Sequence, residues 1–318
     1  EQVPVPPEVR PRVDRRVLVA AGVALFVAGA GGIWRVVKAD EVRPSPLPAP
    51  ACPAGMTLVP AGSVDLRDGE TTRRVSLSAF CIDARQVAQG DYARCVAAGG
   101  DNGCAPANDA WWDGATDAAR GQHRTLCAAW SRDAGLPIAC VSWDMAQHYC
   151  QTRNARLPTE AQWERAARGD DGRAFPWGND APTAARMNGC GLECFATTHP
   201  PGGATAGDVL YLADDRVPYV TAVTHEHFSG DRSPFGVVGL GGNVQEWTAD
   251  CSAPITEGAA QDRAVTCAED TRPRVVRGGG WSTIEADAAK ATFRLPLLPA
   301  TQMADVGFRC VADVIRAR

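Results

Sequence analysis

The stretch GLGGNVQEWTAD, Gly239–Asp250, contains a glycine-rich turn followed at once by an amide, two carboxylates and an indole. Because glycines free the backbone, carbonyl oxygens can converge there with the side-chain oxygens of Asn243 and Glu246. Calcium is a hard cation that takes about six to eight oxygens, so the pattern indicates a cation site. The alternative is a structural turn held by Asn243, with Glu246 paired to one of the many arginines. Trp247 is expected to pack in the core beside it.

Further short motifs surround this stretch in a defined order. They are CPAGMTLVPAG, FCIDARQVAQGDYARCV, PIACVSWDMAQHYCQTRNARLPTEAQWERAARG, FPWGND, SPFGVVGLGGNVQEWTAD, RVVRGGGW and VGFRCV. As an ordered series covering residues 52–312, they closely resemble the formylglycine-generating enzyme (sulfatase-modifying factor) family. The resemblance implies a single α/β domain of the α+β type, related to C-type lectins, low in regular secondary structure and often stabilised by calcium.

The resemblance also implies two calcium sites. The first takes oxygens from Asn243 and Glu246, with a carbonyl near Val244 assisting. The second takes Asn188 and Asp215, although the insert between these two residues departs from the family in length and content. For Asp215, a solvated charged turn is the competing interpretation. We expect structural Ca²⁺ as the cofactor of this chain.

The residues before this domain carry a membrane signal. Val17–Trp34 is an 18-residue run without a charge, preceded by four arginines. Its length is near the lower limit for crossing a bilayer, and the basic residues on its N-terminal side favour a cytoplasmic location for that end. A cleaved signal peptide is the alternative. We expect a cytoplasmic tail over 1–16, a transmembrane anchor over 17–37, a proline-rich linker over 38–51 and a periplasmic or extracellular domain over 52–318.

All twelve cysteines lie beyond that apolar run, as expected for disulfides formed in an oxidising compartment. The family resemblance implies a disulfide between Cys150 and Cys310. For the other cysteines, sequence proximity is the only guide. It favours the pairs Cys52–Cys81, Cys95–Cys104, Cys127–Cys140, Cys190–Cys194 and Cys251–Cys267. A zinc site at Cys190 and Cys194, with His199 nearby, is the competing interpretation.

The chemistry of the family depends on a sulfur pair that the matching segment lacks. Active members, as the resemblance implies, oxidise a substrate cysteine to formylglycine with two cysteines that bind copper(I), because soft thiolates select that ion. In this chain the two positions fall on about Thr283 and Ala288, and no cysteine lies between Cys267 and Cys310. We therefore do not expect copper.

A metal site outside the segment that corresponds to the copper site is the alternative to a chain without a catalytic metal. The motif THEHF places His225, Glu226 and His227 so that alternate residues of a strand jointly hold a metal, although histidines in polar loops are more often solvated. An oxidase would have to draw its thiolates from elsewhere in the chain, for example from Cys251 and Cys267.

Local patterns predict a few regular elements. Period-two alternation predicts short strands within 56–66 and 73–83. Ser142 is expected to cap a helix that runs to Cys150. Thr159 and Gln162 form a capping box that opens a second helix, which Gly169 ends. The stretches 97–140 and 180–234 are expected to be irregular.

Two adjacent indoles in the first irregular stretch, Trp111 and Trp112, are candidates for partner binding. Neighbouring side chains point opposite ways on an extended chain, so one indole is expected in the core and the other as an exposed anchor. The alternative is that both are buried.

These observations leave two functions. The net charge of −5 and the scattered basic residues argue against a nucleic-acid partner. We expect an exported, membrane-tethered and noncatalytic family member whose calcium- and disulfide-braced surface binds a protein, peptide or glycan. The alternative is a copper-dependent oxidase that converts a substrate cysteine to formylglycine in sulfatase maturation.

Overall fold

The computed structural model describes residues 51–100, 103–107, 109–190, 223, 230–255, 264–267, 269 and 271–315. The chain divides into two units, Glu1–Pro46 and Leu47–Arg318, and every described residue belongs to the second. None of the described helices is long and apolar enough to cross a membrane. The expected anchor at 17–37 lies outside the described residues, as does the linker up to residue 50.

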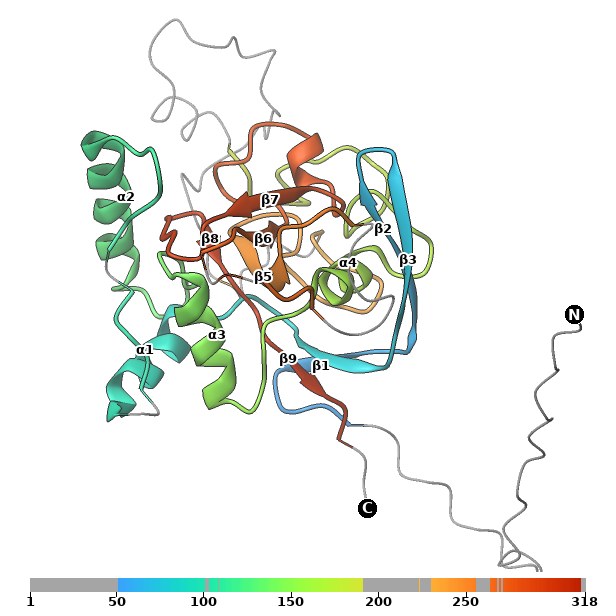
Figure 1. Cartoon of the computed structure of the whole chain (residues 1–318), viewed down its shortest axis with the longest axis horizontal. Coiled ribbons are helices and arrows are strands. Elements are labelled where there is room, and N and C mark those ends of the chain that lie inside the picture. The colour runs from blue at the N-terminus through green and yellow to red at the C-terminus, as the bar shows by residue number, and fades with distance from the viewer. Residues whose placement is uncertain are drawn as a thin grey trace, which may run out of the picture. The chain divides into compact units, whose positions relative to one another are not determined.

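The described strands form three small sheets (Figure 1). The first has the order β1-β4-β9, the second is the hairpin β2-β3, and the third has the order β7-β6-β5-β8 with β5 parallel to β8. The bounds are β1 Met56–Val59, β2 Gly62–Asp68, β3 Thr71–Leu77, β4 Phe80–Asp83, β5 Gln245–Cys251, β6 Arg274–Arg277, β7 Arg294–Leu297, β8 Val306–Gly307 and β9 Val311–Asp313. β1 to β4 occupy the two stretches where alternation predicts strands, which confirms that prediction.

The two predicted helices form where their caps place them. The helix α3, Trp143–Thr152, begins after Ser142, whose hydroxyl accepts a hydrogen bond from the Met145 N–H at 3.3 Å. The helix α4, Glu160–Arg168, begins with both hydrogen bonds of the predicted capping box and ends at Gly169. The signals that predicted α4 are local, namely the capping box and the terminal glycine. Every residue of this helix is also packed against the core.

Two further helices were not predicted. The helix α1 spans Gln89–Ala98, and α2 spans Asp117–Trp130 within the stretch expected to be irregular. The prediction of an irregular loop over 97–140 was therefore wrong. In α2 only Cys127 and Trp130 are buried, so the apolar periodicity that indicates a helix is weak there. Figure 1 shows α2 on the opposite side of the sheets from the β2-β3 hairpin.

The core centres on three tryptophans. Trp163, Trp247 and Trp281 are each no more than 2% exposed. The expectation that Trp247 packs in the core is confirmed, and its indole N–H donates to the Val141 carbonyl at 3.0 Å. Because β5 lies in the middle of the four-stranded sheet, the chain immediately before and within it determines how the surrounding loops are held.

Disulfides connect both neighbouring and distant parts of the chain. The structure forms Cys52–Cys81, Cys95–Cys104, Cys127–Cys140, Cys150–Cys310 and Cys251–Cys267, the same pairs that the sequence suggested. Cys190 is also disulfide-bonded, whereas Cys194 lies outside the described residues. The bridge from Cys150 to Cys310 joins α3 to the chain just before β9, across a sequence separation of 160 residues.

Candidate functional site

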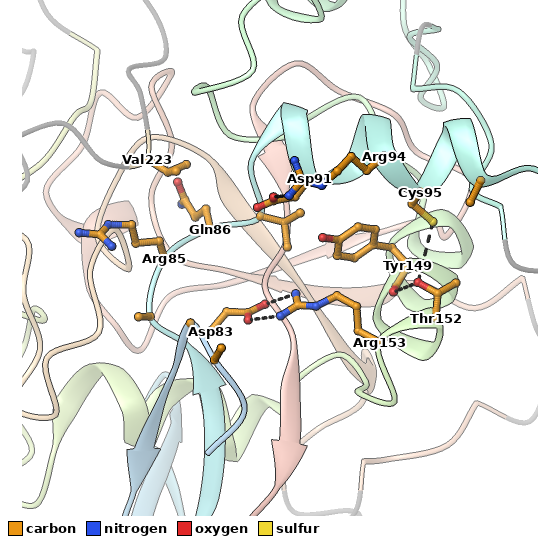
Figure 2. A pocket seen from close by; sticks show the side chains of 15 residues that line it. Asp83, Arg85, Gln86, Asp91, Arg94, Cys95, Tyr149, Thr152, Arg153 and Val223 are labelled. Atoms are coloured by element: carbon orange, nitrogen blue, oxygen red, sulfur yellow. Dashed lines mark hydrogen bonds and ion pairs between the residues drawn. The ribbon is translucent and has the colours of Figure 1, made fainter. Parts of the chain in front are cut away.

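A cavity of about 720 Å³ opens between α1, α3 and the loop that follows β4 (Figure 2). The loop begins at Asp83, at the end of β4, and the five consecutive residues 83–87 all line the cavity, although they differ in burial. Arg85 is exposed, whereas Gln86 and Val87 are buried. The residues that follow β4 thus supply one wall of the cavity, and Gln86 and Val87 also contact the core.

The base of the cavity is an ion pair stacked on an aromatic ring. Arg153, the residue that follows α3, donates two hydrogen bonds to the Asp83 carboxylate, at 2.8 and 3.0 Å. The same guanidinium lies 5.6 Å from the centroid of Tyr149, which stacks on Tyr92 at 5.5 Å. Burial alone would lower the pKa of Arg153, but the Asp83 carboxylate raises it, so the guanidinium stays charged. Burial also raises the pKa of Tyr149, which therefore remains a neutral hydrogen-bonding phenol.

The charges of the cavity do not cancel. Arg153 pairs with Asp83, and Arg94 pairs with Asp91 on α1. Arg85 is exposed, and no ion pair joins it to any described residue. Its guanidinium therefore leaves one positive charge in the cavity without a partner among those residues. A cavity with an aromatic wall and one such arginine suits a ligand that carries a carboxylate or another anion.

The turn before β5 contacts Gln86 of the cavity wall. The carboxylate of Glu246, at the start of β5, has an arginine partner. Glu246 accepts two hydrogen bonds from Arg309, both at 2.7 Å, and one from the Trp163 indole N–H at 2.7 Å. Glu246 is 1% exposed and Arg309 is fully buried. The structure thus shows the alternative for Glu246, pairing with an arginine, and the carboxylate charge is neutralised within the protein.

The two asparagines expected in separate calcium sites are neighbours. Asn243 has a φ of +76°, and its N–H donates to the Asn188 carbonyl at 2.7 Å. The Asn188 side-chain amide donates to the Asn243 side-chain oxygen at 3.1 Å. A Cβ at Gly242 would lie 2.6 Å from the same Asn188 carbonyl, so only glycine allows this approach. The assignment of Asn188 to a second, separate site therefore needs correction, and its expected partner Asp215 lies outside the described residues.

The residues of this turn do not fit a calcium shell as they are arranged. Glu246 is held by Arg309, the Asn243 side-chain oxygen accepts from an amide, and the Val244 carbonyl accepts from the Gln86 side-chain amide at 2.8 Å. Each oxygen expected to bind calcium is thus already an acceptor for an N–H group. Elsewhere in the described part of the chain, no group of three or more His, Cys, Asp or Glu side chains is placed to hold a metal.

The two positions that correspond to the copper site carry no cysteine. The Thr283 hydroxyl accepts a hydrogen bond from the Gly280 N–H at 2.9 Å, and Thr283 is 5% exposed. Ala288 lies in a 3₁₀ turn, Asp287–Ala289. Cys251 and Cys267, the alternative source of thiolates, form a disulfide with each other. Each of the eleven cysteines that the structure describes is disulfide-bonded.

The two candidate anchor indoles, Trp111 and Trp112, are both half-buried. The Trp111 backbone exchanges hydrogen bonds with Gln302, at 2.9 and 2.6 Å. The Trp112 ring lies 4.6 Å from the ring of His123, whose pKa is lowered by burial. The expected pattern of one buried and one exposed indole is therefore not observed, because both residues are half-buried.

The remaining candidate metal ligands are not placed by the structure. His199, His225, Glu226 and His227 lie outside the described residues. The sequence reasoning also missed Arg85, Gln86, Arg153 and Arg309. The only local signal for the cavity is the charged pair of residues at the end of FCIDARQ, Asp83 and Arg85, which lie at the end of an apolar strand and just beyond it. The partners of Gln86 and Arg309 are too distant in the sequence to leave any local signal.

Two buried carboxyl groups predict how stability depends on pH. Burial raises the pKa of Asp231 to about 7, although the Gly241 N–H partly opposes the shift. Burial, followed by the charge of Glu160, raises the pKa of Asp250 to about 7. Because the folded chain holds these protons more tightly than the unfolded chain, their contribution to stability is lost as pH rises toward and through 7.

We expect the melting temperature to fall between pH 5 and pH 7, because each carboxyl lowers the free energy of unfolding by up to about 1.4 kcal/mol per pH unit in this range. The variant Asp231→Asn, which cannot ionise, should flatten the profile. Thermal melts across this range check the prediction, and a melting temperature that rises with pH would show that both groups are ionised in the folded chain.

Comparisons with known proteins agree with this fold. The family model described as sulfatase-modifying factor enzyme 1-like domain matches residues 42–314. A mouse protein named inactive C-alpha-formylglycine-generating enzyme 2 is 29% identical over 84% of this chain and 86% of its own. The formylglycine-generating enzyme of Mycobacterium tuberculosis is 26% identical over 95% of this chain and 87% of its own.

A solved structure shares the same fold. PvdO from Pseudomonas aeruginosa aligns with a TM-score of 0.60 at 21% identity, over 81% of this chain and 94% of that protein. The ordered motifs, the sparse sheets around β5 and the family match over most of the length lead to one conclusion. The chain belongs to the sulfatase-modifying factor enzyme 1-like, or formylglycine-generating-enzyme-like, family.

Proposed function

We propose that this domain is a noncatalytic member of its family that binds a protein, peptide or glycan partner on the exported side of a membrane. The observation that carries the proposal is the absence of sulfur where the family resemblance implies a copper(I) site, at Thr283 and Ala288. A hydroxyl and a methyl group do not replace two thiolates as ligands of a soft ion. The name of the mouse relative, an inactive formylglycine-generating enzyme, supports the same interpretation.

The location of the domain belongs to this proposal. We place it in the periplasm or outside the cell, tethered by a helix over 17–37. The disulfides of the described domain support an oxidising compartment, and the uncharged run Val17–Trp34 supports the tether. Protease treatment of spheroplasts is the corresponding test of topology. Digestion of the domain supports the exported location, and protection of the domain contradicts it.

Counting free thiols separates this function from the oxidase alternative. An oxidase that uses Cys251 and Cys267 needs that pair reduced, whereas a braced binding domain has every cysteine paired. The full chain, denatured without reductant and treated with a thiol reagent, should therefore incorporate none of it. Incorporation of two equivalents that map to Cys251 and Cys267 would favour the oxidase.

We assign partner binding to the cavity between α1 and α3, with Arg85 as its anion-recognising residue. An arginine without a counterion among the described residues is available to bind a carboxylate of an acidic peptide or glycan, and the stack of Arg153 on Tyr149 supplies a preformed part of the wall of the same cavity. A surface at Trp112 is the second candidate, because its half-buried ring lies against His123 at 4.6 Å.

We expect Arg85→Ala to weaken the binding of a labelled oligo-aspartate peptide about tenfold, as the loss of one charge-assisted hydrogen bond implies. Arg74→Ala is the matched control, because Arg74 is also exposed but pairs with Asp65 on the β2-β3 hairpin. Trp112→Ala tests the second surface. Fluorescence polarisation measures all three. Binding that survives Arg85→Ala and is lost in Trp112→Ala would move the site to the tryptophan, and equal loss in Arg74→Ala would indicate nonspecific charge attraction.

A further inference from the structure

The side chain of Gln86 occupies the centre of the turn that precedes β5. Gln86 follows β4 by three positions, is 5% exposed and lies between the cavity and the core. The Asn243 side-chain amide donates to its oxygen at 3.1 Å, which fixes which end of the Gln86 amide faces the turn. The Gln86 nitrogen Nε2 therefore points toward the carbonyl groups of residues 239–244.

Four oxygens surround that single nitrogen. The Val244 carbonyl lies 2.8 Å from Nε2, the Gly239 carbonyl 2.9 Å and the Gly242 carbonyl 3.2 Å. The Glu246 atom Oε1 lies at 3.1 Å. An amide NH₂ group has only two protons, so it faces twice as many acceptors as it can serve with linear hydrogen bonds. Several oxygens converging on one point, one of them a carboxylate, form the arrangement that a hard cation requires.

The positive charge at this place comes from the protein itself. The Arg309 nitrogen Nη2 donates to Glu246 Oε1 at 2.7 Å and to the Gly239 carbonyl at 3.1 Å. Two of the four oxygens around Gln86 therefore also accept hydrogen bonds from one guanidinium nitrogen of Arg309. The distances of 2.8 to 3.2 Å are those of N–H···O hydrogen bonds and are longer than the roughly 2.3 to 2.6 Å of calcium–oxygen bonds.

We infer that the Gln86 amide, backed by Arg309, takes the place of the calcium ion that the family resemblance implies, so that this domain holds the turn before β5 without a metal. The same geometry predicts that one substitution converts this turn into a calcium site. Gln86→Glu would direct a second carboxylate at Glu246 and three carbonyls. These oxygens repel one another unless a divalent cation lies between them, and their number approaches what calcium takes.

The test compares melting temperatures of the full chain, in mild detergent, with excess EDTA and with millimolar calcium chloride. The wild type is expected to melt at the same temperature in both. Gln86→Glu is expected to melt lower in EDTA and to recover by about 5 °C or more in calcium, with one calcium bound per chain in titration calorimetry. Gln86→Met keeps the length of the side chain without its donors. This variant should melt at a lower temperature than the wild type, and its melting temperature should be the same in EDTA and in calcium.

Other results overturn the inference. A wild type that loses stability in EDTA and regains it with calcium would mean that the turn holds a metal after all. A folded Gln86→Glu variant that does not bind calcium would mean that the four oxygens do not form a cation cage. If Gln86→Glu fails to fold even in calcium, the cage is again refuted, and calorimetry on the wild type independently decides whether calcium binds.

Discussion

Replacing Arg309 by methionine should cost the domain about 3 to 5 kcal/mol, the range measured when a buried ion pair loses one partner. The variant leaves the Glu246 carboxylate charged and 1% exposed, with no counterion in contact. It also removes the donors to the carbonyls of Asp83 and Val238, each at 3.0 Å. Since a domain is typically stable by about 5 to 15 kcal/mol, this loss removes a large fraction of the stability of the domain.

Chemical denaturation of the soluble fraction measures this loss, and Arg74→Met is the control. Arg74 and Asp65 form an exposed pair with 71% and 43% of their side chains accessible, so breaking that pair should cost no more than about 1 kcal/mol. The double variant Arg309→Met with Glu246→Gln should regain part of the loss, because no charge then remains buried. An Arg309→Met protein as stable as the control would mean that Glu246 is neutral or solvated in the folded chain.

Removing the disulfide between Cys150 and Cys310 should have an effect of similar size. Replacing both cysteines by alanine releases a constraint between residues 160 positions apart, which in the chain-entropy account costs about 5 kcal/mol. The free energy of unfolding, measured without reductant, reports the loss. This bridge also links α3 to the residue before β9, so its loss should loosen the sheet β1-β4-β9.

The short bridge between Cys95 and Cys104 is the matched comparison. Its cysteines are 9 positions apart, so the same account predicts a loss of about 2.5 kcal/mol when both become alanine. A larger loss for the short bridge than for the long one would show that local packing, and not the freedom of the unfolded chain, determines the contribution of these disulfides.

Local sequence signals predicted the elements that depend on neighbouring residues. The capping box at Thr159 and the cap at Ser142 are satisfied by residues three positions away, and both helices form. The helix α2 escaped prediction because it buries only two residues, so its pattern resembles that of a polar loop. Residues 245 and 246 form the start of β5 and are not part of a free loop, because β6 and β8 pair with them on either side.

The turn before β5 shows why the candidate site was harder to predict. The types of residue there were identified, but their partners are separated from them by 63 to 160 residues. Asn243 and Glu246 were interpreted as calcium ligands because oxygen-bearing side chains near glycines fit that chemistry. The outcome depended on Gln86 and Arg309, whose approach is determined by the tertiary fold, and the sequence motif alone does not distinguish a metal from an internal amide and guanidinium.

The absence of a copper-binding sulfur pair at Thr283 and Ala288 has a direct test. A cysteine peptide that the Mycobacterium tuberculosis relative converts to formylglycine is incubated with this chain, copper(I) and oxygen, and its mass is recorded. A cooperative melt of the same sample confirms that the chain is folded. We predict that the peptide keeps its cysteine mass throughout. Accumulation of the formylglycine product, beyond that seen with copper(I) and oxygen alone, would contradict the noncatalytic function.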